Sequence, residues 1–454
     1  MNLTIQEIAN ALAIDNINDS RSIEQVEFDS RKINQNALFI PLPGARDGHT
    51  FAQAAIENGA IAMLWSQPLD LAPKLEQVTI LPVADVTKAF QQLAVYYREK
   101  IQPKVVAITG SNGKTTTKDM TEAVLAQQYR TYKTQGNYNN DLGLPYTILH
   151  MPVDTEILIL EMGMDHAGEI AFLSTLGQPD AAAITIIGEA HLENLGSREN
   201  IAKAKLEIVT GLKQDGLLLI PADEALLVPL VQSLSQEIRT FGLEQGDLSA
   251  KIINESSQQT TFEVAGAGQA LTIPVLGGYN VKNALIAYGF GQYFGLTSAQ
   301  IAKGLAQVEL TKNRTQWLTA SNGAALLSDV YNANPTAMGL VLDSFARLNL
   351  PGRRLACLAD MLELGPDSLA MHAKMAEHIQ QHYDKVYLYG SQMLALKEAL
   401  ASQNIPYAYF KTDEKAQLIA CLSAELTPTD SLLLKGSNGM GLQAVVQALV
   451  EANQ

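Results

Sequence analysis

The chain has 454 residues, a length that suggests about three domains at roughly 150 residues each. It carries 32 Lys and Arg against 47 Asp and Glu, a net charge of −15, which disfavours nucleic acid and anionic membranes as partners. Its apolar runs are far too short to cross a bilayer, and the two cysteines, Cys357 and Cys421, cannot form a disulfide framework. We therefore expect a cytoplasmic enzyme with no integral membrane association.

Residues 1 to about 100 alternate short apolar runs with turn signals, and from 105 the pattern changes. The stretch NALFIPLPGARDGHTF (36–51) predicts a strand followed by a Gly- and Pro-rich loop. VVAIT (105–109) predicts a strand, then a glycine loop and the helical KTTTKDMTEAVLAQQ (114–128). EILILEMG (156–163), AAAITII (181–187) and GLLLIP (216–221) are near-continuous apolar runs, as expected of strands covered on both faces. Helical stretches between them predict βαβ units and a parallel sheet.

A second α/β unit begins near residue 312, and hairpins are expected over 240–275 at the far edge of the preceding sheet. The predicted fold is α/β with three domains: a small α/β N-terminal domain (1–100), a central P-loop-type parallel-sheet ATPase domain (101–311) and a C-terminal Rossmann-like domain (312–454). The linkers near 100 and 311 are the expected hinges.

The glycine loop TGSNGKTTT (109–117) lacks one glycine of the usual G-x-x-x-x-G-K-[ST] pattern, because Ile108 stands at that position. Gly110 and Gly113 still permit a tight turn, and a helix that starts near Lys114 aims backbone N–H groups at one anion. Lys114 supplies a charge for outer phosphates, and Thr115 a hydroxyl for Mg²⁺. The alternative is a Gly-Asn turn before a helix with a chance lysine. A strand before and a helix after favour the ATP site.

Two further polar residues follow predicted strands. Glu161 ends EILILE and His191 comes soon after AAAITII, at the carboxyl ends of strands, where open parallel sheets place ligand groups. Each has a structural alternative, a solvated strand-end carboxylate for Glu161 and a structural imidazole for His191.

A helix predicted over 199–212 carries a lysine on its apolar side. Ile201, Ile208 and Leu212 form one stripe, Lys205 lies inside it, and Lys203 and Glu207 face the opposite, wet side. A lysine on a core face either snorkels to solvent or has a chemical task, and the pattern alone leaves both open.

Taken in order, these segments resemble the Mur ligases, the ATP-dependent amide-bond-forming enzymes of peptidoglycan synthesis. The matching segments cover nearly the whole chain: DSRKINQNALFIPLPGARDGHTF, TGSNGKTTTK, QGNYNNDLGLPYTIL, EMGM, AHLENLGS, AKAKLEI, GGYNVKNALIA, DVYNANPTAM and LADMLELG. Nine segments in the family's order make the resemblance specific.

Within the family, GNYNNDLGLP and YNANP are most similar to the branch that adds D-alanyl-D-alanine to UDP-N-acetylmuramoyl-tripeptide through an acyl phosphate. The branch that adds the third residue carries a D-N-P-R-type motif, and folylpolyglutamate synthase lacks a DSR…DGHTF domain; both remain alternatives of the same class. A P-loop switch or motor is the alternative from another class, and a GTPase would carry an N-K-x-D motif that the chain lacks. The motifs do not discriminate lysine from diaminopimelate as the third peptide residue.

The resemblance also implies roles for individual residues. It implies ATP phosphate binding by Gly110, Ser111, Asn112, Gly113, Lys114, Thr115 and Thr116. It implies about two Mg²⁺ ions held by Thr115, Glu161, His191 and a CO₂-derived carbamate on Lys205, with Lys114, Glu161, His191 and Lys205 as the catalytic set. Asn280 and Asn283 would lie near the adenine, and Arg314 and Asp329 would reach back to ATP. The implied substrate-binding residues are Ser30, Arg31, Gly44, Asp47, His49, Asn137, Asn140, Tyr331, Asn332 and Asn334. We expect a monomer.

Overall fold

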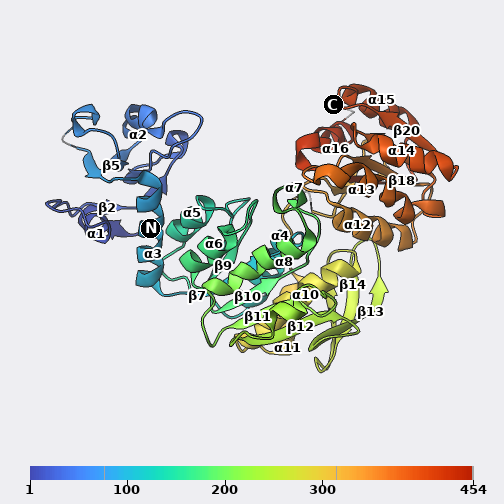
Figure 1. The fold of residues 1–454 in the computed structure, drawn as a ribbon, viewed down its shortest axis with the longest axis horizontal. Helices are drawn as coiled ribbons and strands as arrows, with labels where there is room; N and C mark the ends of the chain where they lie inside the picture. The colour runs from blue at the N-terminus through green and yellow to red at the C-terminus, as the bar shows by residue number, and fades with distance from the viewer. Residues whose placement is uncertain (76, 313, 452–454) are drawn as a thin grey trace.

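The computed structural model describes residues 1–75, 77–312 and 314–451. Its strands form four sheets, which group into three α/β units along the chain. The N-terminal and C-terminal units lie at opposite ends of the central unit (Figure 1). The predicted three-domain α/β fold is confirmed.

The N-terminal domain is built on a four-stranded parallel sheet in the order β3-β4-β5-β6, with a small β1-β2 ladder beside it. Its strands are β1 Leu3–Thr4, β2 Ser22–Ile23, β3 Gln25–Glu27, β4 Ala37–Phe39, β5 Ala60–Trp65 and β6 Thr79–Pro82. Its helices are α1 Ile5–Ala11, α2 Ala52–Glu57 and α3 Val86–Ile101, with short 3₁₀ turns η1 Ser30–Lys32, η2 Gly48–Phe51 and η3 Leu69–Leu71.

The central domain is built on a nine-stranded sheet in the order β15-β14-β13-β12-β11-β10-β7-β9-β8. Its strands are β7 Lys104–Thr109, β8 Thr131–Lys133, β9 Ile157–Glu161, β10 Ala181–Ile184, β11 Leu217–Pro221, β12 Glu237–Leu243, β13 Leu248–Glu255, β14 Thr260–Val264 and β15 Ala270–Ile273. Its helices are α4 Lys114–Leu125, α5 Gly143–His150, α6 Glu169–Gly177, α7 Leu192–Leu195, α8 Arg198–Leu206, α9 Val228–Val231, α10 Gly278–Tyr293 and α11 Ser298–Ala306. The antiparallel β13–β14–β15 edge confirms the hairpins expected over 240–275.

The C-terminal domain has a six-stranded sheet, order β16-β17-β21-β18-β19-β20, parallel except for the edge strand β16. Its strands are β16 Gln316–Thr319, β17 Ala325–Asp329, β18 Arg354–Ala359, β19 Lys385–Tyr389, β20 Tyr407–Phe410 and β21 Ser431–Lys435. Its main helices are α12 Pro335–Arg347, α13 Ser368–Lys374, α14 Met393–Ser402, α15 Lys415–Glu425 and α16 Leu442–Glu451.

Strand β7 lies inside the central sheet, between β9 and β10. Its residues Val106 and Ile108 are fully buried among apolar side chains of α4 and α10. Parallel strands with helices on both faces bury both faces, which explains the near-continuous apolar runs. The carboxyl ends of β7, β9 and β10 therefore meet at one edge of the sheet, where the site described below is built.

The helix predicted over 199–212 is shorter than expected. It ends at Leu206, and a 3₁₀ turn, η4 Glu207–Thr210, follows it. Glu207 is half-buried, and its carboxylate accepts hydrogen bonds from the Gly168 and Ala171 N–H groups at the start of α6, at 2.8 to 3.2 Å. A carboxylate at a helix N-terminus satisfies otherwise unpaired donors, so Glu207 ties α6 to the end of α8 from the polar side of the helix.

In the described ranges, no helix has the length and apolar character required to span a membrane.

Candidate active site

The glycine loop joins β7 to α4, as the sequence predicted. Ile108 belongs to the buried strand, so the turn starts at Gly110 instead. Gly110 and Gly113 have φ of 150° and 80°, and a Cβ at Gly113 would lie 2.6 Å from Asn283 Oδ1. Both positions therefore require glycine. Within the described residues no side chain caps α4, which leaves its first N–H groups directed at the space above the loop.

Lys114 and Thr115 begin α4. The Lys114 ammonium donates to the Gly110 carbonyl at 2.8 Å, so it lies over the loop. Burial lowers the pKa of Lys114, and the nearby charge of Glu161 opposes that shift. The Thr115 hydroxyl accepts a hydrogen bond from Arg314 Nη2 at 3.2 Å, although Arg314 precedes the C-terminal sheet.

Glu161 is the last residue of β9 and is 2% exposed. Its Oε1 accepts a hydrogen bond from Asn139 Nδ2 at 3.0 Å. Its Oε2 is buried without a hydrogen-bond partner among the described residues, and the Lys118 ammonium lies 3.7 Å away. A buried carboxylate oxygen with no donor is costly, and a cation that binds it would remove the cost. Glu161 is therefore not a solvated strand-end carboxylate.

Sequence reasoning missed Asn139 and Lys118. Asn139 stands between Asn137 and Asn140, which were selected from the same NYNN stretch. Lys118 lies four residues after Lys114, on the same face of α4, and is 1% exposed. The four-residue spacing on a predicted helix was the signal available for Lys118.

His191 lies in the loop after β10 with a left-handed backbone, φ 60°. Its Nδ1 is 3.1 Å from Asp165 Oδ1 and 2.9 Å from Glu363 Oε2, a carboxylate of the C-terminal domain. Burial lowers the pKa of His191, and the charges of Lys114 and Lys205 add to this, while Glu363 opposes it. Glu363, in the LADMLELG stretch, is a residue the sequence analysis missed.

Lys205 lies on α8 and is 2% exposed, too little for an amine that snorkels to solvent. Across the described ranges, no carboxylate forms an ion pair with it and no hydrogen bond reaches its Nζ. Burial lowers the pKa of Lys205 well below its ordinary value, and the charge of Lys114 adds to this. Burial thus favours the neutral, nucleophilic form of this amine.

A cavity of about 280 Å³ opens beside the loop, between the central and C-terminal domains. Its lining includes eight residues that the sequence analysis selected: Asn112, Gly113, Thr116, Asn280, Asn283, Arg314, Asp329 and Asn332. Tyr331 packs under the Arg314 guanidinium, 4.0 Å from ring centroid to Cζ, and the buried Lys435 ammonium binds Asp329 at 2.5 Å. Lys435 was missed. Asn334 caps α12 next to this cavity.

The other predicted substrate residues lie elsewhere. Ser30 and Arg31 form η1, and Gly44 precedes η2, which Asp47 caps. The Arg31 side chain is 87% exposed, and Asp29 binds its Nε and Nη2 at 2.9 and 2.8 Å. His49 is buried against Trp65, and its two ring nitrogens contact Asp47 and Ser66.

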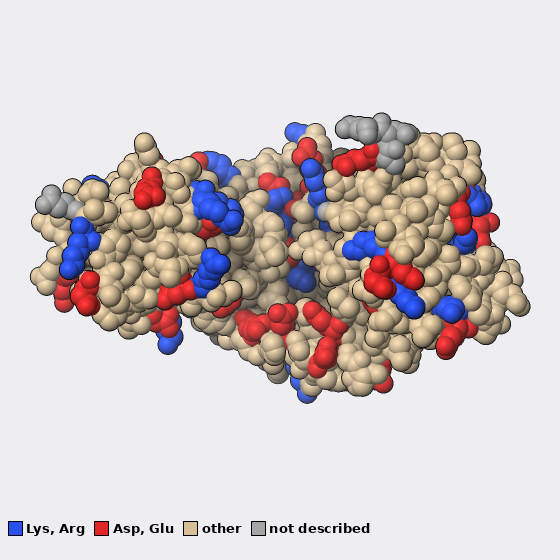
Figure 2. All heavy atoms as spheres, turned by 90° about the horizontal axis from the view of Figure 1, so that it is seen from above, with Lys and Arg blue, Asp and Glu red and all other residues tan. Residues whose placement is uncertain are grey.

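Asn137 and Asn140 line a separate cavity of about 670 Å³, together with Gln91 of α3 and Asp165. This cavity lies between the N-terminal helix α3 and the central domain. Figure 2 shows from above that the surface is hollowed between the two outer domains, with Lys or Arg atoms deep in the hollow.

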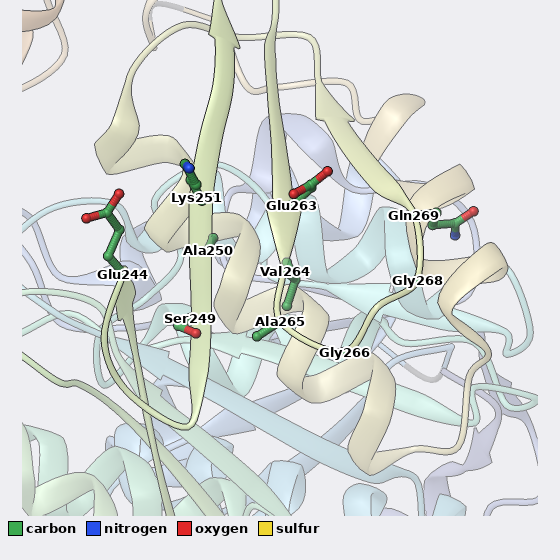
Figure 3. Close-up of a pocket in the computed structure, with 10 residues that line it drawn as sticks. All are labelled: Glu244, Ser249, Ala250, Lys251, Glu263, Val264, Ala265, Gly266, Gly268 and Gln269. Carbon is green, nitrogen blue, oxygen red and sulfur yellow. The ribbon is translucent and has the colours of Figure 1, made fainter.

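A third cavity, of about 450 Å³, lies at the β13–β14 edge (Figure 3). Lys251 and Glu263, which are cross-strand partners, stand on its two neighbouring strands. None of its described lining residues is a predicted site residue. We therefore place the candidate active site at the glycine loop.

The described residues contain no ready-made cluster of three or more His, Cys, Asp and Glu side chains that would hold a metal ion. The groups that fit a cation here are of mixed type: the Thr115 hydroxyl, the unpartnered Glu161 Oε2 and the imidazole of His191. Hard cations such as Mg²⁺ accept oxygen ligands and usually share them with substrate phosphates.

A glycine loop at the carboxyl end of a parallel sheet, beside a cavity closed by another domain, defines a nucleotide-dependent enzyme. Comparison with known proteins narrows this class. Three family models match: "Mur ligase family, catalytic domain" over 22–98, "Mur ligase middle domain" over 108–291 and "Mur ligase, glutamate ligase domain" over 313–438. The chain belongs to the Mur ligase family and is an ATP-dependent amide-bond-forming ligase.

The relatives agree over nearly the full length. The chain is 41% identical to the UDP-N-acetylmuramoyl-tripeptide–D-alanyl-D-alanine ligase of Bacillus subtilis, over 95% of this chain and 94% of that protein. A crystal structure of MurF from Acinetobacter baumannii superposes with a TM-score of 0.88, at 30% identity and 99% coverage of both chains. A MurF ligase from Thermotoga maritima in complex with ADP gives 0.81, at 26% identity, over 94% of this chain and 97% of that one.

Proposed function

We propose that this chain joins D-alanyl-D-alanine to UDP-N-acetylmuramoyl-tripeptide with ATP, giving the pentapeptide precursor of peptidoglycan, ADP and phosphate. The observation that carries the proposal is the meeting of a phosphate-binding loop, a base-sized cavity and two buried, incompletely paired groups, Glu161 and Lys205. The names of the relatives, 41% identical in the Bacillus subtilis case, support this pair of substrates.

The reaction needs an activated carboxylate, because a carboxylate and an amine do not condense in neutral water. Transfer of the γ-phosphoryl group to the terminal carboxylate of the tripeptide breaks the bond to ADP and forms an acyl phosphate. The amine of D-alanyl-D-alanine then attacks the acyl carbon, the amide bond forms, and inorganic phosphate leaves as the amine loses a proton.

The glycine loop would offset the repulsion between the ATP phosphates and the tripeptide carboxylate, the two anions that must approach each other. Gly110, Ser111, Asn112, Gly113 and Thr116 would present backbone N–H groups and the helix N-terminus to the phosphates. Lys114, which already lies over the loop, would meet the outer phosphates with its charge. Positioning and electrostatic stabilisation account for most catalysis of phosphoryl transfer.

The mixed oxygen and nitrogen ligands at the glycine loop fit Mg²⁺, and we propose that two Mg²⁺ ions bind there. Thr115, Glu161, His191 and a carbamate on Lys205 would hold them, and Mg²⁺ supplies neutralisation of the phosphate charge. Glu161 Oε2 accepts no hydrogen bond among the described residues, which supports its share. The buried neutral amine of Lys205 can attack CO₂, forming a C–N bond and releasing a proton, and the resulting anion would suit a cation in its surroundings.

The domains divide the substrates, with 1–100 binding the UDP end, 101–311 ATP and 312–454 the amine. Asn280 and Asn283 would contact the adenine, and Arg314 and Asp329 would reach ATP across the cavity that they line. The remaining substrate residues are Ser30, Arg31, Gly44, Asp47, His49, Asn137, Asn140, Tyr331, Asn332 and Asn334. Closure about the linkers near 100 and 311 would exclude the water that hydrolyses acyl phosphates. We expect a cytoplasmic monomer.

Phosphate release tests this function. The purified protein is given ATP, Mg²⁺ and UDP-N-acetylmuramoyl-tripeptide with a panel of amines, including D-alanyl-D-alanine, D-alanine and single diamino acids. We expect phosphate only with the tripeptide substrate and D-alanyl-D-alanine together. Phosphate release with a diamino acid and UDP-N-acetylmuramoyl-dipeptide would instead assign the reaction that adds the third residue. Phosphate release with ATP alone would assign a switch or motor.

A further inference from the structure

The linker between α11 and β16 is bound to the nucleotide-binding helix α4 at two points. Thr311 donates both its backbone N–H, at 2.9 Å, and its hydroxyl, at 2.8 Å, to Asp119 Oδ2. Arg314 Nη2 donates to the Thr115 hydroxyl at 3.2 Å. Because Thr115 and Asp119 are four residues apart, they lie on one face of α4, and both Thr311 and Arg314 contact that face.

Asp119 is held rigidly as an acceptor. It is 1% exposed, and its other oxygen, Oδ1, accepts a hydrogen bond from Lys133 Nζ at 2.9 Å. The Lys118 ammonium lies 3.9 Å from the same oxygen. Because both of its oxygens are occupied by donors, Lys133 holds the carboxylate in place if the linker shifts. Thr311 makes two hydrogen bonds of 2.9 and 2.8 Å to Asp119, whereas Arg314 makes one of 3.2 Å to Thr115, so the Asp119 contact is the firmer of the two on α4.

The position of Thr311 decides where Arg314 lies, since only two residues separate them. The Arg314 guanidinium packs on Tyr331 at 4.0 Å and lines the cavity beside the glycine loop. A linker that slipped along α4 by a fraction of a turn would carry this guanidinium away from Thr115 and out of the cavity wall. The chain enters the C-terminal sheet directly afterwards, at Gln316.

We propose that Asp119 is a positioning residue of the ligase: it anchors Thr311, fixes the pivot of the C-terminal domain on α4 and thereby places Arg314 against the bound nucleotide. The inference rests on the proposed function for its catalytic meaning, but its structural claim concerns nucleotide binding alone. Asp119 does not touch ATP in this scheme and acts through Thr311 and Arg314.

The test uses the full chain, with two substitutions of Thr311 in the linker and one of Asp119 on α4. Thr311→Val removes the hydroxyl donor, and Thr311→Ser keeps it. Asp119→Asn removes the charge and leaves Lys133 facing an amide. Thr121→Val is the matched control, because Thr121 is a buried threonine on the same helix whose hydroxyl has no partner in the described structure. ADP affinity is measured by calorimetry, KM values by phosphate release, and folding by thermal melts.

We expect Thr311→Val to weaken ADP binding and to raise the ATP KM about fivefold. Asp119→Asn should change both quantities about tenfold or more, which is the scale of one hydrogen bond to a charged group. The KM for the UDP-linked substrate should stay within about twofold, on the scale of surface changes away from a site. Thr311→Ser and Thr121→Val should match the unaltered protein. ADP affinity unchanged in Thr311→Val, or reduced as much in Thr311→Ser, would overturn the proposal, as would an equal rise in both KM values.

ADP affinity needs neither of the other substrates, so it separates this inference from the proposed function. An unaltered protein that binds ADP but joins no dipeptide would contradict the proposed function, while the Thr311 pair would still decide the role of Asp119. If Asp119→Asn does not fold, the Thr311 pair alone decides.

Discussion

Asn112 and Asn334 exchange two amide hydrogen bonds, from Asn112 Nδ2 to Asn334 Oδ1 at 3.0 Å and from Asn334 Nδ2 to Asn112 Oδ1 at 3.1 Å. Asn112 belongs to the glycine loop, and Asn334 caps α12 of the C-terminal domain by accepting the Ala337 N–H at 2.9 Å. The Asn334 side chain thus stabilises a helix and joins the glycine loop to the other domain.

The two tasks of Asn334 can be separated. Asn334→Ser keeps a good N-cap oxygen but is too short to reach Asn112, whereas Asn334→Ala loses both contacts. We expect both variants to raise the ATP KM to a similar extent, and only the alanine variant to lose about 1 kcal/mol of unfolding free energy through the cap. Thermal or denaturant unfolding and ATP kinetics are the measurements.

Thr297→Ala is the control for this pair. Thr297 caps α11 with a capping box, so its loss should lower stability and leave the ATP KM unchanged. An ATP KM that follows stability in all three variants would show that Asn334 has only a structural role.

Lys114→Ala should lose at least ~100-fold in kcat, because it removes one charged group from a preorganised phosphate site. The exposed lysine of α11, changed in Lys303→Ala, is the control and should keep full activity. Steady-state phosphate release measures both. Near-normal turnover in a folded Lys114→Ala protein would sink the assignment of the loop to phosphate binding.

Lys205→Ala should be nearly inactive and still folded, since alanine is a strong helix former and the change removes a buried amine that lacks an ion pair in the described structure. A short carboxylic acid such as acetate should partly restore activity by replacing the carbamate. Lys203→Ala, which changes an exposed lysine on the same helix, should keep its activity and should not respond to acetate.

Two results would remove the carbamate from the mechanism. One is full activity in Lys205→Ala without acetate. The other is a bare ammonium at Lys205 in a crystal that holds ATP and magnesium.

Arg31→Ala should raise the KM for the UDP-linked substrate and leave the ATP KM nearly unchanged, because it removes ground-state binding in one domain. The hydrogen bonds from Arg31 hold the pKa of Asp29 at about 2, so Asp29 stays ionised and must share the guanidinium with any incoming pyrophosphate. Lys74→Ala, another exposed cation of this domain, is the control. Parallel rises in both KM values would refute the assignment of this domain to the uridine nucleotide.

The local sequence pattern determined the strands, turns and helices that carry several of the candidate site residues. A β-branched run, two glycines and a helix-forming run predict a phosphate loop wherever they stand in sequence, because strand, turn and helix depend on neighbouring residues. Glu161 and His191 followed from the same logic, since the carboxyl ends of parallel strands share one edge. Lys205 could be selected because the helical period places it on an apolar stripe, even though the helix proved shorter than expected.

Tertiary structure alone decided which distant groups meet. Asp119 and Thr311 are 192 residues apart in sequence, and Asn112 and Asn334 are 222 apart, so no local pattern relates them. Glu363 reaches His191 only because the C-terminal domain packs over α7. Such contacts depend on how whole elements pack, and packing is set by the shapes of many buried side chains together, which the period of any single segment does not contain.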